Sequence, residues 1–169
     1  MLETPEEMAN LQALLDASMA TAGPHLRDII TDERRLSAVQ LTACLQGMRL
    51  LVLATVTADG RPLAGPVDGY FLHGTFWFSS GRDSVRVRHL AARSDCSATH
   101  LPGEELAVTV HGKAYPFALD DPAYGEFRQA MLDEHLPKQG PAFEQWLDGA
   151  DAVGVRIAPE KMFTYFMAP

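Results

Sequence analysis

The segment of this sequence with the most potential for chemistry starts at Ser79. Two serines and a glycine, Ser79-Ser80-Gly81, are followed by the run Arg82-Asp83-Ser84-Val85-Arg86. If the serines end a strand and Asp83 or Ser84 caps a helix, then hydroxyls, backbone N–H groups and arginine meet at a helix N-terminus, where phosphate binds. The segment is therefore a candidate anion site. Its candidate residues are Ser79, Ser80, Arg82, Ser84 and Arg86.

The same segment reverses the charge of the rest of the chain. Fourteen Lys and Arg against 22 Asp and Glu give a net charge of −8, yet four arginines lie between positions 82 and 93. On a helix, Arg82, Arg86, His89 and Arg93 have the spacing of one face. That face is either an anion site or an ordinary solvated basic surface, and the segment alone favours neither. The overall negative charge disfavours general nucleic-acid binding.

A second feature is a stretch with few large side chains. Residues 63–69 read Leu-Ala-Gly-Pro-Val-Asp-Gly, and they follow a turn, Ala58-Asp59-Gly60-Arg61, that would fold them against the preceding strand. Small residues there let a flat ring lie close to the backbone, and a bulged edge strand explains the composition equally well. The candidate ring-binding residues are Gly65, Pro66, Val67 and Asp68.

The sequence gives little support for a metal, haem, nucleophile or dinucleotide site. Counting outward from the turn at 102–105 places Cys96 opposite His111, which gives two potential metal ligands and no third, so no metal site is predicted. No spacing among the six histidines singles out a haem ligand. Nucleophile-elbow and glycine-rich nucleotide motifs are absent from the sequence. Cys44 and Cys96 lack C-x-x-C spacing and are expected to be reduced.

The elements that must position these residues change type near residue 50. Before it, Thr4 with Glu7 and Ser37 with Gln40 have the spacing of helix capping boxes. After it, β-branched and aromatic runs separated by turn residues predict short strands. The expected strands are 50–57, 63–71, 75–80, 96–101, 106–115, 152–158 and 162–167. We expect a helix from 83 or 84 to 92, and two helices between 121 and 150 that cover a barrel end.

Length and composition predict one domain over residues 1–169, mainly β with peripheral α, built as a small antiparallel barrel. Its parts are a helical N-terminal extension (1–48), a barrel core (50–119), helices (120–150) and closing strands (151–169). The longest apolar run, Leu50–Ala54, is far shorter than the roughly 18 residues of a membrane span. The acidic start, Met1–Glu7, does not read as an export signal. No membrane partner and a cytoplasmic location are expected.

Taken in order, these motifs resemble the pyridoxamine 5'-phosphate oxidase-like FMN-binding split-barrel family. The resemblance covers roughly residues 36–119. It is carried by segments 50–56, 59–62, 65–67, 76–80, 84–86 with Leu90, and 108–114.

The resemblance implies a six-stranded split barrel that forms a homodimer with FMN at the dimer interface. The phosphate of FMN would be held by Ser79, Ser80, Ser84 and Arg86, and its ring would lie along residues 65–68. Arginine at position 86 replaces the commoner lysine and keeps phosphate pairing.

The function implied is that of an FMN-dependent oxidoreductase, with hydride moving through flavin N5 to or from an unknown small-molecule substrate. No residue is assigned as catalytic. Relatives also bind the deazaflavin coenzyme F-420 or haem, so a deazaflavin-dependent reductase, a non-catalytic FMN- or haem-binding protein and a vacant barrel remain alternatives. Residues 163–169 lack the arginine-rich segment with which the true oxidase binds its pyridoxine substrate, which disfavours vitamin B6 oxidation.

Overall fold

The computed structural model describes residues 2–167 and places six strands in one closed antiparallel barrel. Around the barrel the strands follow the order β1-β2-β3-β6-β5-β4. Their bounds are Met48–Val56 (β1), Pro62–Leu72 (β2), Thr75–Gly81 (β3), Asp95–His100 (β4), Leu106–Ala118 (β5) and Ala152–Phe166 (β6). The predicted fold class is confirmed.

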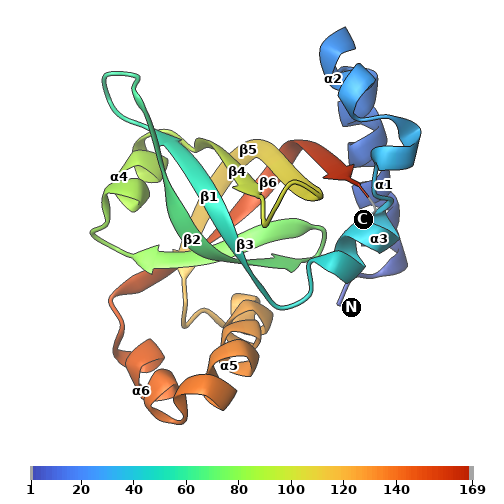
Figure 1. Ribbon diagram of the computed structural model, residues 1–169. Helices are drawn as coiled ribbons and strands as arrows, with labels where there is room; N and C mark the ends of the chain where they lie inside the picture. The colour runs from blue at the N-terminus through green and yellow to red at the C-terminus, as the bar shows by residue number, and fades with distance from the viewer. Residues whose placement is uncertain (1, 168–169) are drawn as a thin grey trace.

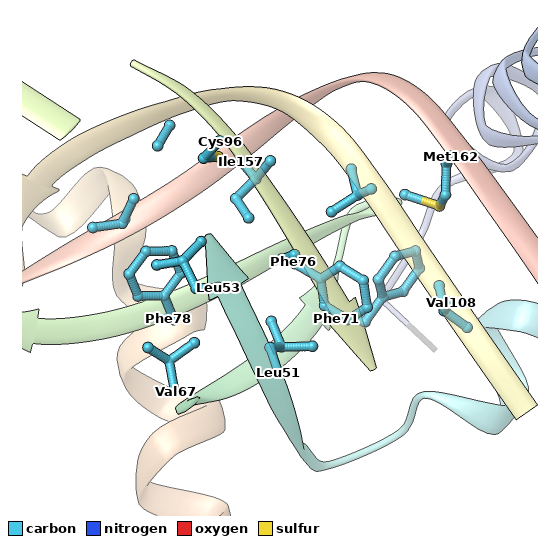
Figure 2. Close-up of a cluster of buried hydrophobic side chains, with 14 of the residues drawn as sticks. Leu51, Leu53, Val67, Phe71, Phe76, Phe78, Cys96, Val108, Ile157 and Met162 are labelled. Atoms are coloured by element: carbon cyan, nitrogen blue, oxygen red, sulfur yellow. The ribbon is translucent and has the colours of Figure 1, made fainter. Parts of the chain in front are cut away.

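Alternation along each strand fills the barrel with apolar side chains. Leu51 and Leu53 of β1 point inward, as do Phe76 and Phe78 of β3, while the residues between them face outward. Figure 2 shows these side chains converging on one core, which Cys96 of β4 also joins. The barrel interior is therefore occupied by side chains, and any ligand site must lie outside it.

The first half of β2 is a free edge. Residues Pro62–Tyr70 pair with β1, whereas pairing with β3 covers only Gly69–Leu72. Pro66, which has no N–H to donate, sits in the half without a β3 partner, as the sequence predicted for a strand with a proline.

The two closing strands expected at 152–158 and 162–167 are one strand, so that prediction was wrong. β6 runs unbroken for 15 residues, pairs with β5 between Val153 and Phe166 and pairs with β3 through Ala152–Arg156. A register shift between His111 and Gly112 of β5 absorbs the Pro159-Glu160 segment that reads as a turn. Because β5 supplies the glycine opposite Pro159, the local sequence of β6 could not show this.

Four helical segments precede the barrel: α1 (Pro5–Ala20), α2 (Pro24–Ile29), the 3-10 turn η1 (Asp32–Arg34) and α3 (Ala38–Cys44). Both predicted capping boxes are present, Thr4 with Glu7 and Ser37 with Gln40. The α1 helix packs on β6, where Ser18 Oγ accepts a hydrogen bond of 2.9 Å from the Met162 N–H.

Two helices, α5 (Gly125–Gln139) and α6 (Ala142–Gly149), follow the short 3-10 turn η2 (Pro122–Tyr124). They cover the outer face of β2 and β3 and not a barrel end, which corrects the sequence expectation. In Figure 1 they lie below the barrel, on a different side from α1–α3. The reason is that β3 is apolar on both faces, because Trp77 points outward between Phe76 and Phe78 and needs a cover of its own. None of the helices in residues 2–167 is both long and apolar enough to span a membrane.

Candidate functional site

The helix α4 (Val85–Ala92), between β3 and β4, begins directly after Ser84, one of the two caps that the sequence offered. Ser84 Oγ accepts a hydrogen bond of 3.3 Å from the Val87 N–H and so caps the helix. Ser80, near the end of β3, has its Oγ 3.0 Å from Ser84 Oγ. A strand-end hydroxyl and a helix N-terminus therefore meet, as an anion site requires.

Arg86, the second residue of α4, connects this helix start to β2. Its Nη1 donates a 3.0 Å hydrogen bond to the Pro66 carbonyl oxygen. A Cβ added at Gly65 would lie 3.4 Å from Arg86 Nη2. The guanidinium thus lies on the side-chain-poor half of β2, so the two features predicted from separate segments adjoin in the fold.

The other basic residues of this segment have different partners. His89 Nδ1 lies 3.1 Å from Thr55 Oγ1, and Arg93 donates to the carbonyls of residues 57 and 58, so with Arg86 they face the β1–β2 hairpin. Arg82 precedes the helix and pairs with Asp151 (Nε–Oδ1 2.7 Å). A single face through all four was therefore a wrong prediction, because the helix begins only at Val85.

The remaining candidates lie in two other places. Val67 is buried in the barrel core. Asp68 and Ser79 face outward and line a cavity between the barrel and the helices α5 and α6. Ser80 is on the other side of β3, where it contacts Ser84. The residues that the structure groups at the predicted anion site are Gly65, Pro66, Ser80, Ser84 and Arg86.

This group fits the phosphate end of a flavin nucleotide. Ser80 and Ser84 supply two adjoining hydroxyls, and one hydrogen bond of Arg86 to Pro66 leaves further guanidinium N–H donors. The donor set is neutral or cationic, and Gly65 leaves the β2 backbone uncovered at the point where the guanidinium approaches it. An anion with an attached flat ring is the ligand that such a surface suits.

Sequence reasoning missed a hydrogen-bonded chain on the outer face of β2. Tyr70 Oη lies 3.0 Å from His135 Nε2, and His135 Nδ1 lies 3.2 Å from the Gln139 amide nitrogen. Burial, followed by the charges of Asp68 and Glu134, raises the pKa of Tyr70 well above its ordinary value. The i, i+4 spacing of His135 and Gln139 was visible, but nothing local linked them to a tyrosine 65 residues away.

The proposed Cys96–His111 pair does not form. Cys96 pairs with Gly112 and points into the core, while Ser97 stands opposite His111 and its Oγ lies 2.7 Å from His111 Nδ1. The last pair of the β4–β5 ladder is His100 with Val108, so residues 101–107 connect the two paired stretches in place of the assumed turn at 102–105, and this shifts the register by one. Within residues 2–167, no cluster of three His, Cys, Asp or Glu side chains is placed to hold a metal ion.

Three solved structures illustrate the relatives of this fold. The haem storage protein HutZ from Vibrio cholerae superposes with a TM-score of 0.62 at 17% identity, covering 78% of this chain and 95% of its own. An FAD-binding protein from Mesorhizobium loti gives 0.56 at 20% identity, covering 78% and 93%. An F420 reductase gives 0.56 at 20% identity, covering 71% and 93%.

The sequence comparisons agree with the fold. No curated protein matches the chain in sequence. The sequence model of the pyridoxamine 5'-phosphate oxidase family, however, matches residues 39–166, which include all six strands and the Ser80–Arg86 site. The chain therefore belongs to the pyridoxamine 5'-phosphate oxidase family.

Proposed function

We propose that this protein is a homodimeric oxidoreductase that binds FMN between the N-terminus of α4 and the free edge of β2. The observation that carries the proposal is the contact of Arg86 with Pro66 and Gly65, which joins a phosphate-type donor set to an uncovered strand backbone. Family membership and the flavin-binding relative from Mesorhizobium loti support it.

The chain's own residues would bind and orient the cofactor. Ser80, Ser84 and Arg86 would donate hydrogen bonds to the phosphate, with the dipole of α4 adding a partial positive charge. The backbone of residues 65 and 66 would lie against the flavin ring. Bound FMN supplies hydride chemistry at its N5 atom, and the protein supplies binding, orientation and electrostatics.

A second copy of this chain would cover the outer face of β1. Leu50 and Val52 on that face are 61% and 52% exposed, and Val52 pairs directly with Pro66 of the proposed cofactor site. The aromatic strand β3 does not need a second copy as a cover, because α5 and the barrel core already cover Trp77 and its neighbours. The apolar face on β1 is the one that continues into the cofactor site.

The decisive experiment on the cofactor compares Arg86→Ala with Arg88→Ala in flavin titrations at fixed ionic strength. Loss of a charge-assisted hydrogen bond should weaken FMN binding about ten- to a hundredfold in Arg86→Ala. Arg88 donates to the Asp83 carbonyl and lies about 200° around the helix from Arg86, so Arg88→Ala is the matched control and should change little. Equal losses, or none, would reject the phosphate site.

The ligand that co-purifies with the protein decides between FMN and the alternatives. A flavin spectrum supports the proposal, whereas the deazaflavin coenzyme or a haem Soret band would assign the site to the chemistry of the F420 reductase or of HutZ. Exposed Arg88 and Arg93 continue the positive charge along α4, the one feature that favours the longer anionic tail of the deazaflavin coenzyme.

A further inference from the structure

A cavity of about 310 Å³ lies between the outer face of β2–β3 and the helices α5 and α6. It is separate from the Ser80–Ser84–Arg86 group but shares the neighbourhood of β2, since Asp68 is two residues beyond Pro66. Its volume is at the lower end of the range for small-molecule sites, roughly 300–1,000 Å³. A ligand of about two fused rings is the size it suits.

One wall of the cavity is formed by aromatic rings that are tilted toward one another. The rings of Phe143 and Trp146 have centroids 5.6 Å apart with planes at 33°, and the His135 ring lies 4.6 Å from Phe143, also at 33°. Trp146 is 60% exposed although it belongs to this cluster. Such a wall selects flat ligands, which stack in an offset arrangement and bury the exposed indole.

Tyr70 offers this cavity a hydrogen-bond donor. The amide nitrogen of Gln139 can only donate, so His135 Nδ1 accepts, and the proton of the neutral imidazole is then on Nε2. Nε2–H donates to Tyr70 Oη, which leaves the hydroxyl proton of Tyr70 without an acceptor in the described part of the chain. Since burial raises the pKa of Tyr70, the group stays a phenol and can donate that proton to a ligand.

The charge of the cavity excludes anions. Asp68 is the charged side chain at its lining, and neither lysine nor arginine is among the described residues that line it. A phosphate group here would meet a carboxylate and no cation. The cavity is therefore unsuited to the phosphorylated compound after which the family is named.

We propose that this cavity binds an uncharged, flat aromatic ketone or aldehyde whose carbonyl oxygen accepts a hydrogen bond from Tyr70. The aromatic wall fixes the plane of the ring, and the Tyr70–His135–Gln139 chain fixes the direction of the donor. The identification of this ligand as the substrate rests on the proposed oxidoreductase function. The prediction that the cavity binds it does not depend on that function.

Equilibrium dialysis of the flavin-free protein with three probes tests this. 2-Acetylnaphthalene carries the carbonyl, 2-isopropenylnaphthalene has nearly the same shape without an acceptor, and 2-naphthyl phosphate is anionic. We expect the ketone to bind about three- to tenfold more tightly than the alkene, the worth of one neutral hydrogen bond. The phosphate should bind most weakly.

Tyr70→Phe should remove the difference between ketone and alkene and leave the affinity of the alkene unchanged. The variant keeps the ring that packs edge-on against Phe127 at 5.7 Å, so it should fold, which near-UV circular dichroism checks. Tyr115→Phe, on the exposed face of β5, is the matched control and should preserve the difference. Trp146→Ala should weaken both neutral probes.

Three results would overturn the proposal: no binding of the ketone, equal binding of the phosphate, or a ketone preference that survives Tyr70→Phe. Flavin titration of Arg86→Ala is independent of all three. Ketone binding with no effect of Arg86→Ala on flavin would leave the cavity standing and reject the cofactor site, and the reverse pattern would do the opposite.

Discussion

Arg86 makes a structural contact within the chain in addition to its proposed role in binding phosphate. Through its hydrogen bond to Pro66 it ties α4 to the free edge of β2, and this leaves further guanidinium N–H groups that can donate to a ligand. Lysine keeps the charge but cannot make two directed contacts with one planar group. Arg86→Lys should therefore bind FMN more tightly than Arg86→Ala and less tightly than the wild type in the same titration.

Gly112 is required by a close approach of two strands. A Cβ at this position would lie 2.1 Å from the backbone oxygen of Ala158, so β5 and β6 would have to separate. Gly112→Ala should lower the free energy of unfolding by about 1–3 kcal/mol, measured by urea denaturation.

Gly125→Ala is the control for that experiment. Gly125 has nothing within 4 Å of an added Cβ, and its φ of −56° suits alanine at the start of α5. This variant should be neutral or more stable by up to about 1 kcal/mol. Equal destabilisation by both substitutions would show that the β5–β6 approach is not the cause.

Residue-level prediction from the sequence succeeded where the signal was local. Ser84, Ser80 and Arg86 lie within one strand end and one helix start, so their proximity follows from chain geometry. It failed for Tyr70 and His135, which come together only because α5 returns across the outer face of β2.

At the scale of elements, the turn between β2 and β3 fastens two helices to the barrel. His73, with a left-handed φ of 53°, contacts Glu7 of α1 through Nδ1 at 3.0 Å and Glu126 of α5 through Nε2. Burial lowers the pKa of His73, but hydrogen bonds and charges of Glu126 and Glu7 outweigh it, so the net pKa lies above the ordinary value.

This contact makes part of the stability depend on pH. Because the folded pKa of His73 is raised, its contribution is fully present below the unfolded value of about 6.5 and is lost as pH rises through the folded pKa. His73→Asn tolerates the left-handed backbone and removes the charge. Urea titrations should show the wild type losing its advantage over His73→Asn as the pH is raised from 5.5 to about 8.5. A constant difference across that range would exclude the charge of His73 as the cause.

The elements predicted from the sequence were correct where start signals and alternation agreed. Both capping boxes and the strand at 75–80, observed as Thr75–Gly81, are examples. β6 was divided in two because Pro159-Glu160 resembles a turn, and only the register shift in β5 shows how a strand continues through it. Propensity describes one strand at a time, whereas a bulge belongs to a pair.

At the scale of the whole molecule, the apolar face on β1 predicts a dimer. Light scattering at micromolar concentration should report about twice the 18.5 kDa of one chain. Val52→Lys should shift the protein toward monomer and weaken FMN binding, because Val52 lies beside Pro66. Val39→Lys, on an equally exposed part of α3, is the matched control and should leave the mass unchanged. A wild-type monomer would contradict the prediction.

The barrel class followed from strand count and turn spacing, but the side on which α5 and α6 pack did not. That placement depends on Trp77 facing outward from a strand already apolar within, a consequence of how β2 and β3 pair. The family resemblance selected the residues of the proposed cofactor site from segments before residue 119, while the cavity between the barrel and α5 and α6 needed the structure.

Because β6 pairs with both β3 and β5, one edge of β3 stays unpaired on the ribosome until β6 has been synthesised. About 70 residues separate the end of β3 from the start of β6, so at roughly 5–20 residues per second β3 waits about 4 to 14 seconds for its second neighbour. During that interval Phe76 and Phe78 border an open strand edge, the kind of surface on which nascent chains pair with one another. The helices α5 and α6 emerge within the same interval and cover the outer face of β3 first. This order of emergence predicts that folding depends on chaperones, and that they bind the exposed inner face of β3.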